Sequence, residues 1–349
     1  MSELSLGLLL VVGAGLGTGT IAWPLAKIKT LRFEYFLFTY MLVGIVLIPW
    51  VIMLCGVRSV SELINVVGVR TLLIANLLSV SWGVANVIYL VCVIRIGAAI
   101  TGAVLTSLGM SVGVIMPLLV RGDGRFADAP TLFSNQGVVI LIGLLVLLVG
   151  VVLTSRAGLY REKLLHRKTN YSRSHQIVSA FRKNILLVVL AGVLSAGISL
   201  TFVYSQDAIL GAVLQQGASE TVGNFSVWAL AMLGGAVVNV GYGVYLMVKR
   251  KSLKSFSLSG IEVLVGYVAG AQFILSIVLM GKGMVLLGAL GASVGFAIQQ
   301  STQILGNQIV GFVNGEWKEV RGSPRKTMYW SIAVIILGVI LLAGSNSMY

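Results

Sequence analysis

Apolar segments long enough to cross a membrane make up most of the sequence. A helix of about 20 apolar residues covers a hydrocarbon layer of about 30 Å, and it satisfies its own backbone hydrogen bonds in lipid. We expect ten such helices, near residues 3–22, 35–54, 71–94, 98–120, 135–155, 184–204, 226–248, 261–280, 284–311 and 328–345. Only 10% of the 349 residues are charged, against about a quarter in a soluble domain. The sequence therefore predicts an all-α membrane protein.

The first segment is interpreted as a retained span. No basic run and no small-residue cleavage site precedes Trp23, although a secretory signal peptide requires both. The two cysteines, Cys55 and Cys92, lie in or beside apolar segments. We therefore expect neither a disulfide framework nor a cysteine-based metal site.

The basic residues are distributed unevenly between the two sides of the predicted spans. The formal net charge is +14, with 25 Lys and Arg residues. Twenty of these fall on one side, and the other five are Arg58, Arg70, Arg121, Arg125 and Lys282. Because cytoplasmic loops carry the excess of Lys and Arg, both termini are predicted to lie outside. The basicity is thus a signal of topology in a bacterial inner membrane, and no nucleic-acid partner is expected.

The longest polar run divides the chain into two halves of five spans. Residues 156–183 contain eight Lys or Arg residues together with His166 and His175. We therefore predict an N-terminal repeat at 1–155, a basic cytoplasmic linker at 156–183 and a C-terminal repeat at 184–349. An odd number of spans per half inverts the second repeat, and transporters built in this way bind substrate near the midplane. An alignment of Gly97 on Gly283 places Asn86 opposite Gln272.

Polar side chains within spans are candidates for a solute pathway, because they are costly in lipid unless they face a cavity or another helix. In the third span, Trp82, Asn86 and Tyr89 share one helix face at i, i+4 and i+7. Aromatic planes can stack on the C–H surface of a pyranose while an amide binds its hydroxyls. The alternative is an interhelical asparagine bond flanked by packing aromatics.

The ninth span carries the densest group of amides. Gln300, Gln303 and Asn307 share a face, and Gln299 lies beside it. This face predicts the lining of an aqueous cavity, with hydrogen bonding between helices as the alternative. Gln272 in the eighth span completes the predicted substrate-binding set. Weaker candidates, each more often structural, are Thr18, Thr20, Trp23, Ser195, Ser199, Tyr204, Asn239, Tyr242 and Tyr267.

Acidic residues avoid the predicted midplane. Glu262 edges into the eighth span and Asp207 lies just beyond the sixth. They are the remaining candidates for proton coupling. Both histidines lie in the linker, and there is no His-Glu metal motif and no Walker loop. We therefore expect neither an enzyme nor a bound cofactor or metal.

Short motifs occur along most of the chain. They are Ala22-Trp23-Pro24-Leu25-Ala26-Lys27; Trp82-Gly83 with Asn86, Tyr89, Arg95 and Gly97; Ser195-Ala196-Gly197; Gly234-Gly235-Ala236 with Asn239 and Gly241; and Ile309-Val310-Gly311 followed by Glu316-Trp317. Together they resemble the L-rhamnose-proton symporter family of the drug/metabolite transporter superfamily. The resemblance implies ten helices in two inverted five-helix repeats, and sugar uptake driven by protons. The family is richer in aromatics in spans eight and nine, which argues for a changed substrate here.

These observations predict a secondary active transporter of a rhamnose-like sugar or small polar metabolite, working by alternating access. Its partners would be the solute, protons and membrane lipids. One alternative is an exporter of lipophilic or amphiphilic metabolites, which would need a largely apolar cavity. A second is a membrane sensor or scaffold whose basic linker docks a partner, although such a protein needs no polar midplane.

Overall fold

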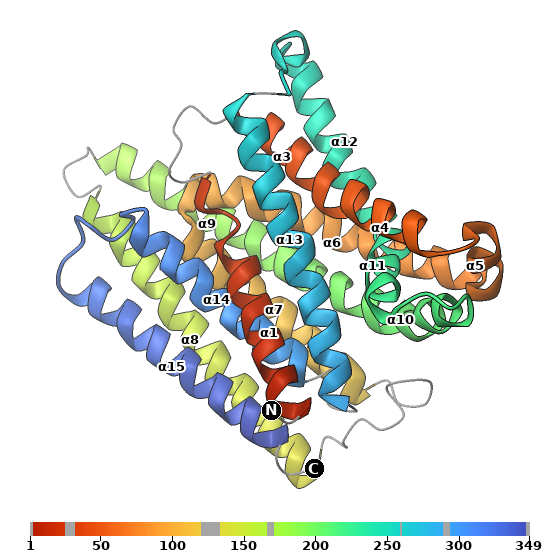
Figure 1. The fold of residues 1–349 in the computed structure, drawn as a ribbon. Coiled ribbons are helices and arrows are strands. Elements are labelled where there is room, and N and C mark those ends of the chain that lie inside the picture. Colours follow the sequence, from red (N-terminus) through yellow and green to blue (C-terminus); the bar gives the residue numbers. More distant parts are fainter. Residues whose placement is uncertain are drawn as a thin grey trace. The chain divides into compact units, whose positions relative to one another are not determined.

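The computed structural model describes residues 3–24, 32–119, 133–165, 171–258, 260–288 and 294–346 (Figure 1). Its regular elements there are all helical. By length and composition, seven helices can cross a membrane, and an eighth is counted if one bent pair forms a single span. The prediction of an all-α, multi-pass membrane protein is confirmed, and the number ten stays a prediction. Arg121, Arg125, residues 25–27 of the first motif and residues 166–170 of the linker lie outside the described residues.

The described helices follow one another along the chain. In order they are α1 (Glu3–Thr20), α3 (Phe33–Met41), η1 (Leu42–Leu47), α4 (Ile48–Gly56), α5 (Val60–Val67), α6 (Val69–Ile96), α7 (Ala98–Leu119), α8 (Asn135–Leu165), α9 (Tyr171–Ser195), α10 (Gly197–Gln215), α11 (Glu220–Ala231), α12 (Leu233–Lys249), η3 (Leu253–Ser255), α13 (Ile261–Leu286), α14 (Phe296–Val313) and α15 (Ser323–Asn346). The second predicted span corresponds to α3, η1 and α4 in succession, with η1 a π-helical stretch.

Several predicted boundaries differ from the structure. The sixth span, predicted at 184–204, crosses the break at Ala196 between α9 and α10. The predicted start of the ninth span at 284 is wrong, because α13 continues to Leu286. Apolar residues continue through this region, so hydropathy alone could not place the end. Gly288 follows α13 with a φ of 64°, a conformation in which glycine commonly ends a helix.

Much of the predicted linker is helical. The helix α8 continues to Leu165, ten residues beyond the predicted end of the fifth span, and α9 begins at Tyr171. Arginine, lysine and glutamate are good helix formers, so a polar run can extend a helix past the membrane. Charge marks where a span ends, but not where its helix ends.

The chain forms two compact units, each assembled from separated segments. Unit 1 comprises Met1–Lys27, Ile88–Val193 and Gly283–Tyr349, and unit 2 comprises Ile28–Val87 and Leu194–Lys282. Both units draw on residues from both sides of the linker. The helix α6 contributes to unit 2 up to Val87 and to unit 1 from Ile88.

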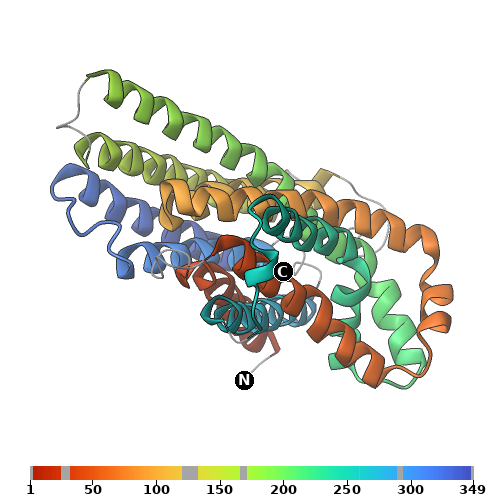
Figure 2. The ribbon, with the colours of Figure 1, turned by 90° about the horizontal axis from the view of Figure 1, so that it is seen from above.

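In unit 1, α8 packs along α15, while α14 packs against both α1 and α7. Both views show α8 and α15 side by side (Figure 1 and Figure 2). The contact of α1 with α14 depends on Gly15, because a Cβ there would collide with the Thr302 hydroxyl and the Gln299 carbonyl oxygen. Small residues allow such close approach of helices in membranes.

In unit 2, α10 packs against α11, α3 against α12, and α4 against α11. The helices α11 and α12 meet at an angle of 60°. Asn76 and Ser79 of α6 satisfy the backbone at this bend. The Asn76 amide donates to the Leu230 carbonyl at 2.9 Å and accepts from Gly234 N–H at 2.8 Å, and Ser79 Oγ accepts from Gly235 N–H at 3.0 Å. A broken helix is tolerated in a membrane when neighbouring groups replace its lost bonds in this way.

Candidate functional site

A cluster of amides and hydroxyls lies within unit 1, where α14 meets α1 and the end of α6. We call Thr18, Tyr89, Gln299, Gln303 and Asn307 the amide cluster. The Gln299 side-chain amide donates to Thr18 Oγ1 at 3.0 Å and lies 3.3 Å from Gln303 Oε1. Thr18 Oγ1 itself lies 3.2 Å from Gln303 Oε1. The cluster thus joins α1 to α14 through side chains as well as through the contact at Gly15.

Tyr89 and Asn307 extend the cluster to α6. The Tyr89 hydroxyl donates to Asn307 Oδ1 at 2.7 Å, and the Asn307 amide donates to the Gln303 carbonyl oxygen at 2.9 Å. Both side chains are buried, and a Cβ on Gly102 of α7 would collide with the Asn307 side chain. Three helices therefore meet at Asn307.

One amide of α14, Gln299, has a hydrogen-bond acceptor that no described residue uses, and the neighbouring Gln300 is buried. Gln299 Oε1 is buried and has no hydrogen-bond partner among the described residues. Gln300 is 5% exposed. Buried polar groups in proteins are almost always paired with protein or water, so Gln299 Oε1 is open to a water molecule or a solute hydroxyl.

A second cluster lies within unit 2 and combines amides with aromatic rings. We call Tyr40, Trp82, Asn86, Asn239 and Phe273 the aromatic cluster. The Asn86 amide donates to Asn239 Oδ1 at 2.7 Å, and the Asn239 amide donates to the Gly235 carbonyl oxygen at 2.8 Å. Trp82 stacks on Phe273 with ring centroids 5.7 Å apart, and Phe273 meets Tyr40 edge to face at 5.6 Å.

The predicted substrate-binding residues therefore fall into two groups. Tyr89, Gln299, Gln303 and Asn307 are joined in unit 1, with Gln300 on the same helix. Trp82 and Asn86 belong to the aromatic cluster of unit 2, and the half-buried Gln272 is the neighbour of Phe273 in α13. Their role in binding stays a prediction. Asn239 and Thr18, weaker candidates by sequence, are direct partners of Asn86 and Gln299.

Two ion pairs that involve a largely buried carboxylate were not predicted from the sequence, and of their two arginines Arg161 is buried whereas Arg250 is exposed. In unit 1, Arg161 donates to Glu316 at 3.2 Å and to the Ile96 carbonyl oxygen at 3.1 Å, and Glu316 accepts from Ala98 N–H at 2.9 Å. In unit 2, Arg250 pairs with Glu34 at 2.6 Å. From the sequence, Arg161 was interpreted only as one of the basic residues on the cytoplasmic side. The Glu316-Trp317 motif was the one sequence signal that pointed to this segment.

The proton-coupling candidates lie in different surroundings. Glu262 is half-buried in the first turn of α13, and Asp207 is exposed on α10. Their coupling role stays a prediction. Among the residues that the structure describes, no group of three or more His, Cys, Asp or Glu side chains could hold a metal ion.

Comparison with known proteins points to a transporter family. The sequence profile described as "L-rhamnose-proton symport protein (RhaT)" matches residues 2–346. The chain belongs to this family. Its relatives include the L-rhamnose-proton symporter of Escherichia coli (strain ATCC 8739), 24% identical over 322 residues, and that of Klebsiella pneumoniae subsp. pneumoniae, 23% identical over 321 residues. Each alignment covers 90% of this chain and 90% of the relative.

Membership of the RhaT family confirms the resemblance seen in the motifs. The match extends over both predicted repeats and the linker, so it concerns the whole chain and not a shared module. The family is one of symporters, and the chain is therefore a transporter and not an enzyme.

Proposed function

We propose that this protein takes up a rhamnose-like sugar together with protons by alternating access. The observation that carries this proposal is the match of the RhaT family over residues 2–346. The relatives named above are L-rhamnose-proton symporters, which supports both the sugar and the proton. Neither the lipophilic exporter nor the scaffold is favoured by this family.

Each cluster, taken by itself, offers a different kind of interaction with a sugar. In unit 2, the stacked rings of Trp82 and Phe273 offer aromatic faces for the C–H surface of a pyranose, and Asn86 lies on the same helix as Trp82. In unit 1, Gln299, with its unpaired Oε1, would bind sugar hydroxyls together with its cluster partners. A buried hydrogen bond of this kind contributes about 1–3 kcal/mol when its loss leaves a group unsatisfied.

We further propose that ten spans form two inverted five-span repeats, 1–155 and 184–349, joined by the linker 156–183. The order of spans would make α3 to α4 the counterpart of α11 to α12, α7 that of α14 and α8 that of α15. Within unit 2, α3 packs on α12, and within unit 1, α7 packs on α14 and α8 on α15. Counterparts related by a two-fold axis in the membrane plane meet where they lie near that axis, which supports the proposal.

The protein would lie in the bacterial inner membrane with both termini outside, because 20 of 25 Lys and Arg residues are then cytoplasmic. Single cysteines at Arg58 and Lys254, in a variant whose Cys55 and Cys92 are replaced by serine, test this orientation. An impermeant thiol reagent should label the cysteine at Arg58→Cys in intact cells. Labelling of Lys254→Cys instead would reverse the assigned topology.

Transport is tested by uptake of radiolabelled L-rhamnose into proteoliposomes, with other aldohexoses and a panel of hydrophobic amines as competitors. We expect L-rhamnose or a close sugar to accumulate when the outside is made acidic, and the amines to leave uptake unchanged. The proposal would be contradicted if neither L-rhamnose nor any competing sugar were taken up or bound, or if an imposed pH gradient did not change the rate of uptake.

The coupling candidates are tested in the same vesicles with Glu262→Gln and Asp207→Asn. The variant that removes the coupling group should still exchange sugar in both directions without accumulating it. Glu34→Gln and Glu316→Gln are the comparison variants, because those carboxylates are already held in ion pairs. Loss of accumulation only in the comparison variants would move the coupling role to the ion pairs.

A further inference from the structure

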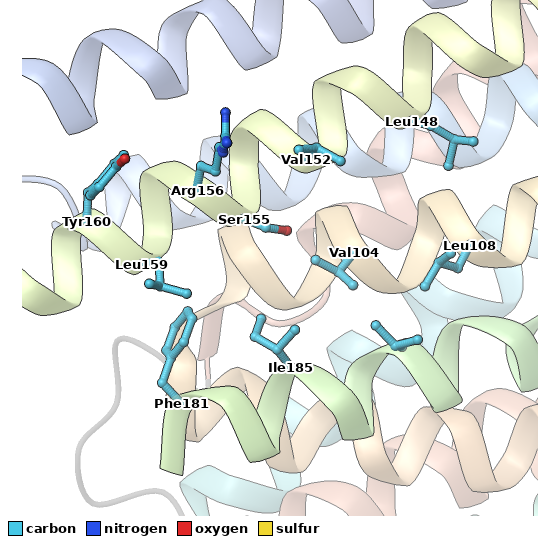
Figure 3. Close-up of a pocket in the computed structure, with 11 residues that line it drawn as sticks. Val104, Leu108, Leu148, Val152, Ser155, Arg156, Leu159, Tyr160, Phe181 and Ile185 are labelled. Atoms are coloured by element: carbon cyan, nitrogen blue, oxygen red, sulfur yellow. The ribbon is translucent and has the colours of Figure 1, made fainter. Parts of the chain in front are cut away.

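An apolar crevice in unit 1 lies among α7, α8 and α9 (Figure 3). Its volume is about 640 Å³, and its walls carry Val104 and Leu108 from α7, Leu148 and Val152 from α8, and Phe181 from α9. Leu159 of α8 also points toward Phe181 across the crevice (Figure 3). A site of this size is within the range of sites that hold small molecules, about 300–1,000 Å³.

The crevice opens outward. Val152 and Val189, which line it, retain 56% and 38% of their surface, and Tyr160 retains 48%. The segment Gly137–Arg161 of α8 is apolar enough to cross the membrane. The lining side chains of α8 therefore lie within the depth of the lipid, so the molecules available to fill the crevice from its open side are membrane components.

Polar groups are confined to one end of the crevice. Ser155, Arg156 and Tyr160 of α8 lie there, and the exposed side chains of Arg156 and Tyr160 extend from α8 on the side away from Phe181 and Ile185 (Figure 3). The exposed Arg182 and Lys183 follow Phe181 in α9 at the same end. Leucine, valine and isoleucine side chains line the remaining length. The crevice is thus amphipathic, with positive charge at the end that the Lys and Arg distribution assigns to the cytoplasm.

The apolar length of the crevice matches one leaflet. From Leu148 to Tyr160 the helix rises about 18 Å at 1.5 Å per residue, and half of the hydrocarbon layer is about 15 Å thick. An acyl chain that enters from the cytoplasmic leaflet would therefore reach from Arg156 to Leu148. Its phosphate would lie at the end of the crevice where Arg156 and Tyr160 can donate hydrogen bonds.

We propose that this crevice binds an anionic phospholipid of the cytoplasmic leaflet. One acyl chain lies along α7, α8 and α9, and the phosphate is held by Arg156 with Arg182 and Lys183 nearby. Basic pockets between membrane helices on the cytoplasmic side bind anionic head groups by this combination of charge and apolar depth. The lipid links α8 to α9, the two helices whose ends form much of the predicted linker. This role is separate from sugar binding.

The test is native mass spectrometry of the full-length detergent-solubilised protein titrated with phosphatidylglycerol or with phosphatidylethanolamine. Arg156→Gln should weaken phosphatidylglycerol binding about tenfold, as expected for the loss of one charge-assisted hydrogen bond, and leave phosphatidylethanolamine binding unchanged. Val152→Trp, which fills the crevice from its open side, should displace phosphatidylglycerol. The matched controls are Lys326→Gln, an exposed charge on α15, and Leu186→Trp, an exposed residue of α9 that does not line the crevice.

Each other outcome overturns the proposal. Equal binding of both lipids to the unmodified protein would make the crevice a site for any acyl chain. Unchanged phosphatidylglycerol binding in both Arg156→Gln and Val152→Trp would place the lipid elsewhere. A dimer that only Val152→Trp dissociates would identify the face as an interface between two copies. Melting curves of the purified variants show whether a loss of binding reflects unfolding. If Arg156→Gln is unfolded, Arg156→Lys, which keeps the charge, is tested instead and must bind phosphatidylglycerol normally.

Discussion

The polar groups of the two units are organised differently. In unit 1, the amides of α14 are bonded mainly to one another, to Thr18 and to Tyr89. In unit 2, a single amide pair, Asn86 and Asn239, lies in a cluster with the stacked rings of Trp82 and Phe273. Unit 1 therefore combines hydrogen bonding with close helix packing, whereas unit 2 provides aromatic surface. Polar side chains at membrane depth can thus contribute to helix packing and to solute binding to different extents in the two units, and mutations can separate these roles.

The largest expected effect is on the stability of unit 2. Asn76→Leu leaves the Leu230 carbonyl and the Gly234 N–H without their partner at the bend of α11 and α12. Each unsatisfied backbone group in a membrane costs several kcal/mol, so we expect a loss of about 3 kcal/mol or more and little folded protein after extraction. Size-exclusion chromatography with a fluorescent fusion measures this. Leu77→Ala, a neighbour that is 70% exposed, is the control and should behave normally.

In unit 1, the corresponding test concerns the approach of α1 to α14. Gly15→Val should destabilise the protein by about 3 kcal/mol, the upper end of ordinary overpacking, because its side chain would meet the backbone of α14. Gly13→Val is matched in helix and in chemistry, and no atom lies within 4 Å of the Cβ position at Gly13. Equal melting temperatures of the two variants would show that α1 does not pack on α14 as described.

Mutations of Tyr89 and Asn307 test whether this part of the amide cluster stabilises the packing of helices or binds sugar. Interhelical hydrogen bonds in membranes contribute about 0.6–2 kcal/mol. In a double-mutant cycle, Tyr89→Phe and Asn307→Leu should each lower stability by that amount, and the double variant should lose less than the sum. If both single variants instead melt normally and lose uptake, the cluster is a binding site and the contrast between the units disappears.

The smallest effects are expected on sugar affinity. Asn86→Ala and Gln303→Ala should each raise the KM for uptake about tenfold, the equivalent of one buried hydrogen bond of about 1.4 kcal/mol. Trp82→Phe keeps an aromatic face and should change the KM less than Trp82→Ala. Wild-type KM values for both amide variants, measured in proteoliposomes, would remove these residues from the proposed site.

Sequence patterns predicted the helices and their polar faces better than the hydrogen-bond and ion-pair partners of the side chains. The membrane-length segments and the faces of Trp82 with Asn86 and of Gln303 with Asn307 follow from composition and helical periodicity. The partners do not, because Asn76 bonds residues more than 150 positions away and nothing near it in sequence marks the bend. Arg161 was likewise assigned by charge alone, since its pairing with Glu316 depends on how α8 packs beside the segment after α14. Tyr89 shares a helix face with Trp82, yet the two belong to different units.

The bend between α11 and α12 has a consequence for how unit 2 can move. The peptide groups that lack a helical partner at this bend are hydrogen-bonded to Asn76 and Ser79, so straightening the segment would break three hydrogen bonds at once in a medium without water. Elbow-like flexing at this point is therefore unfavourable. The helices α11 and α12 should instead move together with α6 as one rigid body, which also carries Trp82 and Asn86. A probe on α11 and another on α12 should keep a constant separation while sugar is bound and released.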